Sequence, residues 1–127
     1  MKITITPDQL AHEVDKILKE YNNDVRQVVN EAVTENAKSG AKELRATSPR
    51  RYGNYAKSWT TQTTKNELNE KTAVIKNRDH YQLTHLLEKG HATRNGGFSE
   101  AQRHIKPVED NVNKEFYNDV IEGVKKL

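Results

Sequence analysis

The segment PDQLAHEVDKILKEYNNDVRQVVNEAVTENAKSGAKEL, residues 7–44, carries the longest helical pattern of this sequence. Its apolar side chains recur every three or four residues, which places them on one face of an α-helix. Thr6 is a suitable capping residue, and Pro7 suits the first helical turn. We therefore predict one long helix over residues 7–46. The apolar positions are Leu10, Val14, Ile17, Tyr21, Val25, Val28, Ala32, Val33, Ala37, Ala41 and Leu44.

A helix of about 40 residues is about 60 Å long. A single domain of 127 residues cannot cover a rod of this length completely. Either the helix breaks near Ser39 and Gly40, where helix propensity drops, or its exposed part packs on another subunit. We favour a single long helix, with Gly40 as the place where it could bend.

Two strands are expected after a loop. Pro49 and the turn signal at Gly53 predict the loop over residues 47–56. The segments SWTTQTT and TAVIKN are rich in strand-forming side chains and are joined by polar residues, which predicts a β-hairpin or meander over residues 57–78. Since two strands alone are marginally stable in water, the hairpin must lie against the first helix, with Trp59 as its anchor.

Two further helices are expected towards the C-terminus. Three leucines of the segment YQLTHLLEK share one face of a short helix predicted over residues 80–89, and Gly90 ends it. Residues 91–103 contain an Asn-Gly-Gly run and almost nothing to bury, so we expect a mobile loop. Pro107 then opens a C-terminal helix over residues 107–125.

These elements predict an α+β fold in one domain spanning residues 1–127. A long N-terminal helix packs on a small antiparallel β-sheet, followed by a short middle helix and a C-terminal helix. Hydrophobic residues make up 33% of the chain and charged residues 31%, so the core is thin and neighbouring subunits could supply part of the stability. There is no cysteine, no apolar run long enough to span a membrane and no secretory signal pattern.

Positive charge is concentrated in the middle of the chain. Residues 1–46 carry 7 basic and 8 acidic side chains, residues 47–106 carry 11 and 5, and residues 107–127 carry 3 and 5. A basic centre between two mildly acidic helices suggests a surface for nucleic acid or for an acidic partner. The alternative is a solvated, lysine-rich face without a partner.

Arginines and tyrosines in the two predicted loops are the candidates for such contacts. Arginine binds phosphate well and aromatic rings stack on unpaired bases, but no recognition-helix or zinc-finger pattern is present, so DNA contact would be non-specific. Alternatively, the tyrosines pack at the base of the loop and the arginines pair with acids of neighbouring subunits. The candidates are Arg50, Arg51, Tyr52, Tyr55 and Lys57 in the first loop, and Arg94 and Arg103 in the second.

The histidines are candidate metal ligands. His85, Glu88 and His91 follow one another at three-residue steps, and His104 could be a fourth ligand. The pattern is not His-Glu-x-x-His, and Gly90 ends the helix before the second histidine. We favour local hydrogen bonds that tie the short helix to the chain entering the last one. No nucleophile elbow or phosphate-binding loop is present, so we expect no enzyme activity, no metal and no cofactor.

Three segments resemble a known family when they are taken in order. The first is the long amphipathic helix that ends in the Ser48-Pro49 loop, and the second is the GNYAKSW segment, residues 53–59. The third is YQLTHLLEKGH, residues 81–91, followed by a variable loop and HIKP, residues 104–107. Over about residues 7–125 the chain resembles the tail-component (head–tail joining) family of tailed bacteriophages. The motif positions are Gly53, Trp59, His85, Glu88, Gly90, His91, His104 and Pro107.

The resemblance has departures. Many family members have Asp-Thr-Gly where this chain has Arg51-Tyr52-Gly53, and Pro-Phe where it has His104-Ile105. What these positions contact is therefore left open by the resemblance.

The resemblance implies a non-enzymatic virion protein, a subunit of a ring where the DNA-filled head meets the tail. Its implied partners are portal or head-closure proteins, the tail terminator or tail tube, and further copies of itself, with non-specific DNA contact and no membrane. Its implied location is the virion, after assembly in the cytoplasm of the bacterial host. The competing readings are a small DNA-binding or packaging accessory protein and a metal-dependent hydrolase or toxin.

Overall fold

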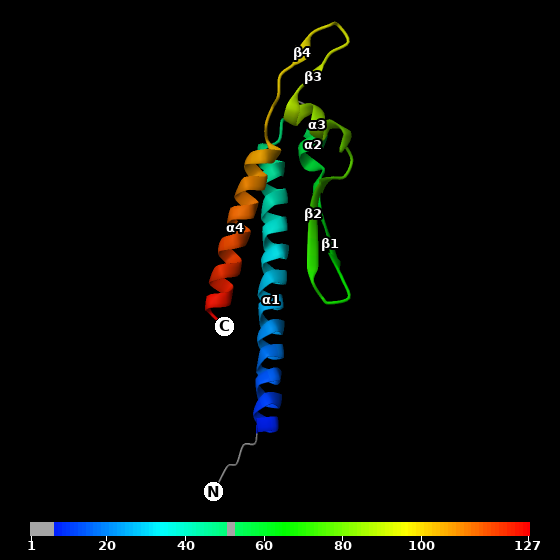
Figure 1. Cartoon of the computed structure of the whole chain (residues 1–127). Helices are drawn as coiled ribbons and strands as arrows, with labels where there is room; N and C mark the ends of the chain where they lie inside the picture. The colour runs from blue at the N-terminus through cyan, green and yellow to red at the C-terminus, as the bar shows by residue number, and fades with distance from the viewer. Residues whose placement is uncertain (1–6, 51–52) are drawn as a thin grey trace.

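The computed structural model describes residues 7–50 and 53–127, and at positions 7–11, 13 and 14 it describes the backbone alone. The described residues form helices of different lengths and two small β-hairpins, which alternate along the chain (Figure 1). In order, they are α1 (Pro7–Thr47), α2 (Gly53–Lys57), β1 (Trp59–Lys65), β2 (Lys71–Asn77), α3 (Gln82–Lys89), β3 (His91–Ala92), β4 (Phe98–Ser99) and α4 (Ile105–Lys125).

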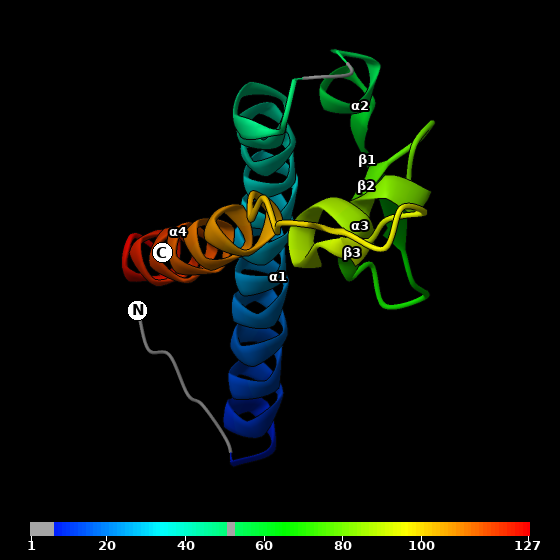
Figure 2. The same cartoon turned by 90° about the horizontal axis from the view of Figure 1, so that it is seen from above.

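Helix α1 is the rod on which the other elements are arranged. Helix α4 runs back along one side of it and the β1–β2 hairpin lies along the other (Figures 1 and 2). Helix α3 lies on the hairpin side near the C-terminal end of α1, and β3–β4 extends past that end (Figure 1). Strands β1 and β2 are antiparallel, with a register that runs from Trp59 opposite Asn77 to Lys65 opposite Lys71. The predicted α+β class and the packing of a small antiparallel sheet on the long helix are confirmed.

A small core holds these elements together near the C-terminal end of α1. Leu44, Tyr55, Trp59 and Val108 form its buried centre, and each comes from a different element. The indole Nε1 of Trp59 donates to the hydroxyl of Ser48 over 2.7 Å, which satisfies the only polar atom of the ring as it enters the core. The structure thus places the predicted anchor, Trp59, where it joins the hairpin to the end of α1.

Gly40 is a point of close approach in an unbroken helix. A Cβ at this position would lie 2.7 Å from Ile75 Cδ1 of β2 and 2.7 Å from Val112 Cγ2 of α4. Because there is no side chain, both elements can pack against the same turn of α1. Helix α1 continues through this position, so the glycine serves packing here, whereas the sequence suggested it as the place for a bend.

The predicted loop over residues 47–56 is partly helical, which corrects that prediction. Helix α2 begins at Gly53, and its Tyr55 and Ala56 are buried. The hydroxyl of Ser58 also donates to the carbonyl of Asn54 over 2.6 Å. Burial of one apolar face stabilises a single turn that local propensity alone would not hold.

The segment 91–103, predicted as a loop, contains the two-residue strands β3 and β4. A tight turn joins them, since the N–H of Thr93 donates to the carbonyl of Gly97 over 2.8 Å. Gly96 has a φ of 78°, a left-handed conformation that glycine adopts without strain. The Asn-Gly-Gly run therefore makes a hairpin turn, which the sequence alone did not show.

Substituting Gly40 tests the close approach. Gly40→Val should lower the free energy of unfolding by about 1–3 kcal/mol, because Ile75 and Val112 must both move away from the new side chain. Ser39→Val is the matched control, since Ser39 is exposed on the same helix. Urea unfolding of the two variants measures the difference. Equal stability of the two would contradict the packing role.

Candidate assembly surfaces

A hydrogen-bond network joins α3, α2 and the start of α4. The carboxylate of Glu88 accepts the backbone N–H of His104 over 3.0 Å and that of Ile105 over 2.8 Å. These N–H groups lie at the N-terminus of α4, where no carbonyl of the helix can accept them. Glu88 therefore caps α4 from another helix, and its negative charge is also stabilised by the helix dipole. This cap explains why α4 begins at Ile105, two residues before the predicted start at Pro107.

His104 links the same network to the buried Tyr55. Its Nδ1 lies 2.7 Å from the carbonyl of Gln102, which can only accept, so Nδ1 carries the proton and donates. In the neutral ring, Nε2 then accepts from the Tyr55 hydroxyl over 2.7 Å. The rings of Tyr55 and His104 also pack edge-to-face, with centroids 5.6 Å apart. Burial, and next the nearby charge of Glu88, raise the pKa of Tyr55 to about 12.

The structure separates the candidate metal ligands. Glu88 and His104 meet as described, in the hydrogen-bonding role that we favoured for them, but His85 is exposed and is bonded to neither. His91 is partly buried, and its Nδ1 has no hydrogen-bond partner among the residues that the structure describes. Among residues 7–50 and 53–127, no three side chains of the metal-ligating types are placed to hold an ion.

The basic candidates gather at one end of the molecule. Arg50, Lys57, Arg94 and Arg103 are exposed and belong to segments around α2, α3 and β3–β4, which lie at the C-terminal end of α1 (Figure 1). Tyr55 is only 1% exposed, so it is not available to a partner, and its inclusion among the contact candidates is corrected. Arg51 and Tyr52 lie outside the described residues. We call the exposed set of four the basic end.

The opposite end of α1 extends beyond the rest of the fold (Figure 1). Helix α4 reaches α1 as far as Val28, against which Gly123 packs. Before that point the apolar side chains of Ile17, Leu18 and Tyr21 are 60%, 55% and 47% exposed. We call these three side chains the rod stripe. They continue the helical pattern of the core but have no cover within the described part of the chain.

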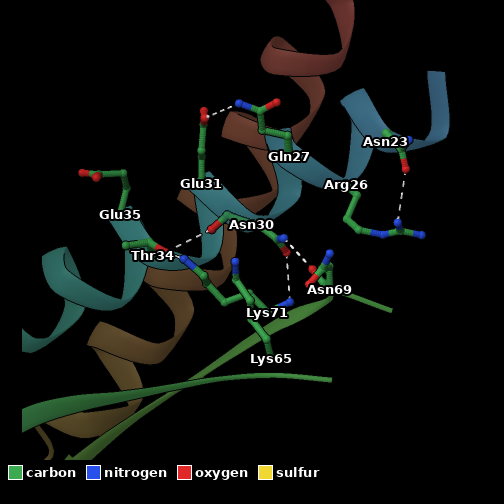
Figure 3. Close-up of a pocket in the computed structure, with 10 residues that line it drawn as sticks. All are labelled: Asn23, Arg26, Gln27, Asn30, Glu31, Thr34, Glu35, Lys65, Asn69 and Lys71. Carbon is green, nitrogen blue, oxygen red and sulfur yellow. Dashed lines mark hydrogen bonds between the residues drawn. The ribbon is translucent and has the colours of Figure 1, made fainter. Parts of the chain in front are cut away.

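A polar cleft of about 600 Å³ lies between α1 and the turn end of the β1–β2 hairpin (Figure 3). The sequence analysis did not predict this cleft. A usable signal was the pair of lysines, Lys65 and Lys71, at the two ends of the polar turn, because a hairpin closed there sets their positive charges side by side. The residues that line the cleft are Asn23, Arg26, Gln27, Asn30, Glu31, Thr34, Glu35, Lys65, Asn69 and Lys71.

Comparison with known proteins supplies the family. Residues 8–90 match the model of a family described as "Bacteriophage HK97-gp10, putative tail-component". The chain belongs to this family of phage tail components. The match covers more than half of the chain, from α1 to the glycine that ends α3. Comparisons with curated proteins and with solved structures find no match.

Membership makes this tail component a structural protein of the phage tail and places it in the virion. The resemblance to the tail-component family is thereby confirmed over residues 8–90, while the head–tail joining role stays a prediction. In the described part of the chain, none of the helices has the length and apolar character required to cross a lipid bilayer.

The cap on α4 can be tested by shortening Glu88. Glu88→Ala should destabilise the tail component by about 2 kcal/mol, because it leaves two backbone N–H groups unpaired and removes a charge from the helix N-terminus. Glu88→Gln keeps an acceptor without the charge, so its cost should be intermediate. Thermal unfolding measures both, with exposed Glu100→Ala as control. A cost of Glu88→Ala no larger than that of the control would contradict the cap.

The raised pKa of Tyr55 predicts a pH dependence of stability. The folded protein keeps this phenol protonated above the ordinary pKa of 10.0, up to about 12. Its contribution is therefore present below pH 10 and is lost as the pH rises towards 12. Urea unfolding should show the native protein losing roughly 2 kcal/mol more than Tyr55→Phe across this range. Parallel stability curves for the two proteins would refute the assignment.

Proposed function

We propose that this tail component is a subunit of the head–tail connector, or neck, which completes the tail and joins it to the DNA-filled head. In this role it forms a homo-oligomeric ring and contacts portal or head-closure proteins on one side and the tail terminator or tail tube on the other. It assembles in the cytoplasm of the bacterial host. It acts through protein contacts, without catalysis.

The rod stripe is the observation that carries this proposal. Three large apolar side chains in adjacent turns of a projecting helix are costly to leave in water. About half of each is exposed, and burying that half contributes about 1 kcal/mol per side chain. A neighbouring subunit in a ring would cover them, and a ring closes because each copy offers one surface and receives another. The thin core fits the same role, since a subunit completed by its neighbours needs less stability on its own.

The basic end supports a second contact at the other end of the molecule. Arg50, Lys57, Arg94 and Arg103 are exposed, and they belong to segments far apart in sequence that the fold brings to the same end of α1. In a neck such a region would face DNA in the channel or an acidic surface of the portal or tail. The two ends of α1 thus offer different chemistry, one apolar and one positive.

Charge placed on the rod stripe should stop assembly without unfolding the protein. In Ile17→Glu/Tyr21→Glu, both changes are at exposed positions, so the melting temperature of the isolated protein should stay within a few degrees of the native one. Phage carrying the variant should accumulate separate heads and tails, and so should a phage that lacks the gene. Electron microscopy of lysates counts joined particles.

Lys16→Glu is the control, because it places the same charge on an exposed position of the same helix segment. It should join heads to tails normally. Normal joining in the absence of the gene would reject the neck function. Normal joining by the double variant alone would reject the rod stripe as the interface.

A further inference from the structure

The polar cleft is held open by the fold itself. The side-chain amide of Asn30 on α1 donates to the carbonyl of Asn69 over 2.7 Å, and its oxygen accepts the backbone N–H of Lys71 over 2.9 Å. The ammonium of Lys71 donates to the hydroxyl of Thr34 over 2.7 Å. These three bonds fix the turn end of the hairpin to α1 (Figure 3). The walls of the cleft are therefore in place before any ligand binds, which lowers the entropic cost of binding.

Three positive charges line this cleft without a negative partner. Within the part of the chain that the structure describes, every ion pair involves cations other than Arg26, Lys65 and Lys71. Lys65 and Lys71 are also direct cross-strand partners, and like charges placed opposite each other destabilise a hairpin. A carboxylate or other oxyanion bound between them would remove this repulsion.

The helix wall of the cleft argues against nucleic acid as the occupant. Glu31 and Glu35 line it, and Glu31 is positioned by a hydrogen bond of 3.2 Å from Gln27. A continuous chain of phosphates would meet these two negative charges. A polypeptide segment can instead direct one acidic side chain at the lysines and place amide or basic donors against the two glutamates.

We propose that the cleft binds an acidic side chain on a segment of another virion protein. The inference rests on the proposed neck function, because it identifies a partner contact of the assembled particle. The cations that receive the carboxylate are Arg26 from α1 and Lys65 and Lys71 from the hairpin. Glu31 and Glu35 favour a partner segment that carries amide or basic hydrogen-bond donors next to its acidic side chain. This contact is separate from the basic end, which lies at the far end of the hairpin.

The first experiment uses defined probes on the isolated protein. In NMR titrations, a hexaglutamate peptide should shift the amide signals of Asn30 and Lys71 in a salt-sensitive way. Arg26→Glu/Lys65→Glu should weaken this binding about tenfold or more. Lys38→Glu/Lys76→Glu is the matched control, with one exposed cation on α1 and one on the hairpin, and it should bind nearly as the native protein does.

Two outcomes of this titration would overturn the proposal. One is an equal loss of peptide binding in the control variant, which would mean that net charge alone attracts the peptide. The other is a hexathymidylate oligonucleotide that shifts the same signals at a lower concentration than the peptide, which would make nucleic acid the occupant.

The second experiment tests the contact in the particle. Phage carrying Arg26→Glu/Lys65→Glu should lose joined particles by about a hundredfold, while the control variant joins normally and both purified variants keep the native melting temperature. Revertants should carry Asp or Glu changed to Lys or Arg in another virion gene. Failure of the gene deletion to block joining would reject the neck function itself. Normal joining by the cleft variant, beside a deletion that blocks it, would reject the cleft contact alone.

Discussion

The hairpin β1–β2 and helix α4 bury their apolar side chains against the same stretch of α1, and Gly40 allows them to do so together. Its missing side chain lets Ile75 and Val112 approach a single helical turn. The core formed by Leu44, Trp59 and Val108 lies just beyond this turn. Since the packing is concentrated there, the N-terminal end of α1 is left largely uncovered. The elongated shape of the molecule follows from this uneven burial of α1.

The cap that Glu88 makes on α4 extends this order from the core to the neighbouring segments at the C-terminal end of α1. It holds the start of α4 against α3, while His104 links α4 to the buried Tyr55. The basic end is built on these segments. A change that weakens the cap should therefore disturb the basic end, which we assign to DNA or to an acidic partner, more than it disturbs the N-terminal part of α1.

These features describe a protein that is well ordered in its middle and open to partners at both ends and in the cleft. The apolar rod stripe, the four exposed cations of the basic end and the unpaired cations of the cleft differ in chemistry, so they can engage different surfaces without competing. The neck role that we propose, in which one subunit contacts two large assemblies, would require this kind of separation. Its small core is then consistent with stability that is completed on assembly.

The sequence by itself determined the elements whose signals are local. Apolar spacing predicted α1 and α4, strand-forming residues around a polar turn predicted the β1–β2 hairpin, and the order of motifs indicated the phage family. Trp59 could be recognised as an anchor because a lone indole beside a long apolar face has few other places to be buried.

Only the tertiary structure decided which distant side chains meet. Three contacts depend on how the elements pack: Glu88 caps a helix that starts 17 residues later, Tyr55 turns inward to His104, and the N–H of Lys71 meets Asn30. The short helix α2 and the β3–β4 turn likewise exist because burial and a left-handed glycine stabilise conformations that local propensity leaves undecided. Spacing along a chain reports which face a side chain occupies, whereas the partner on that face is set by packing.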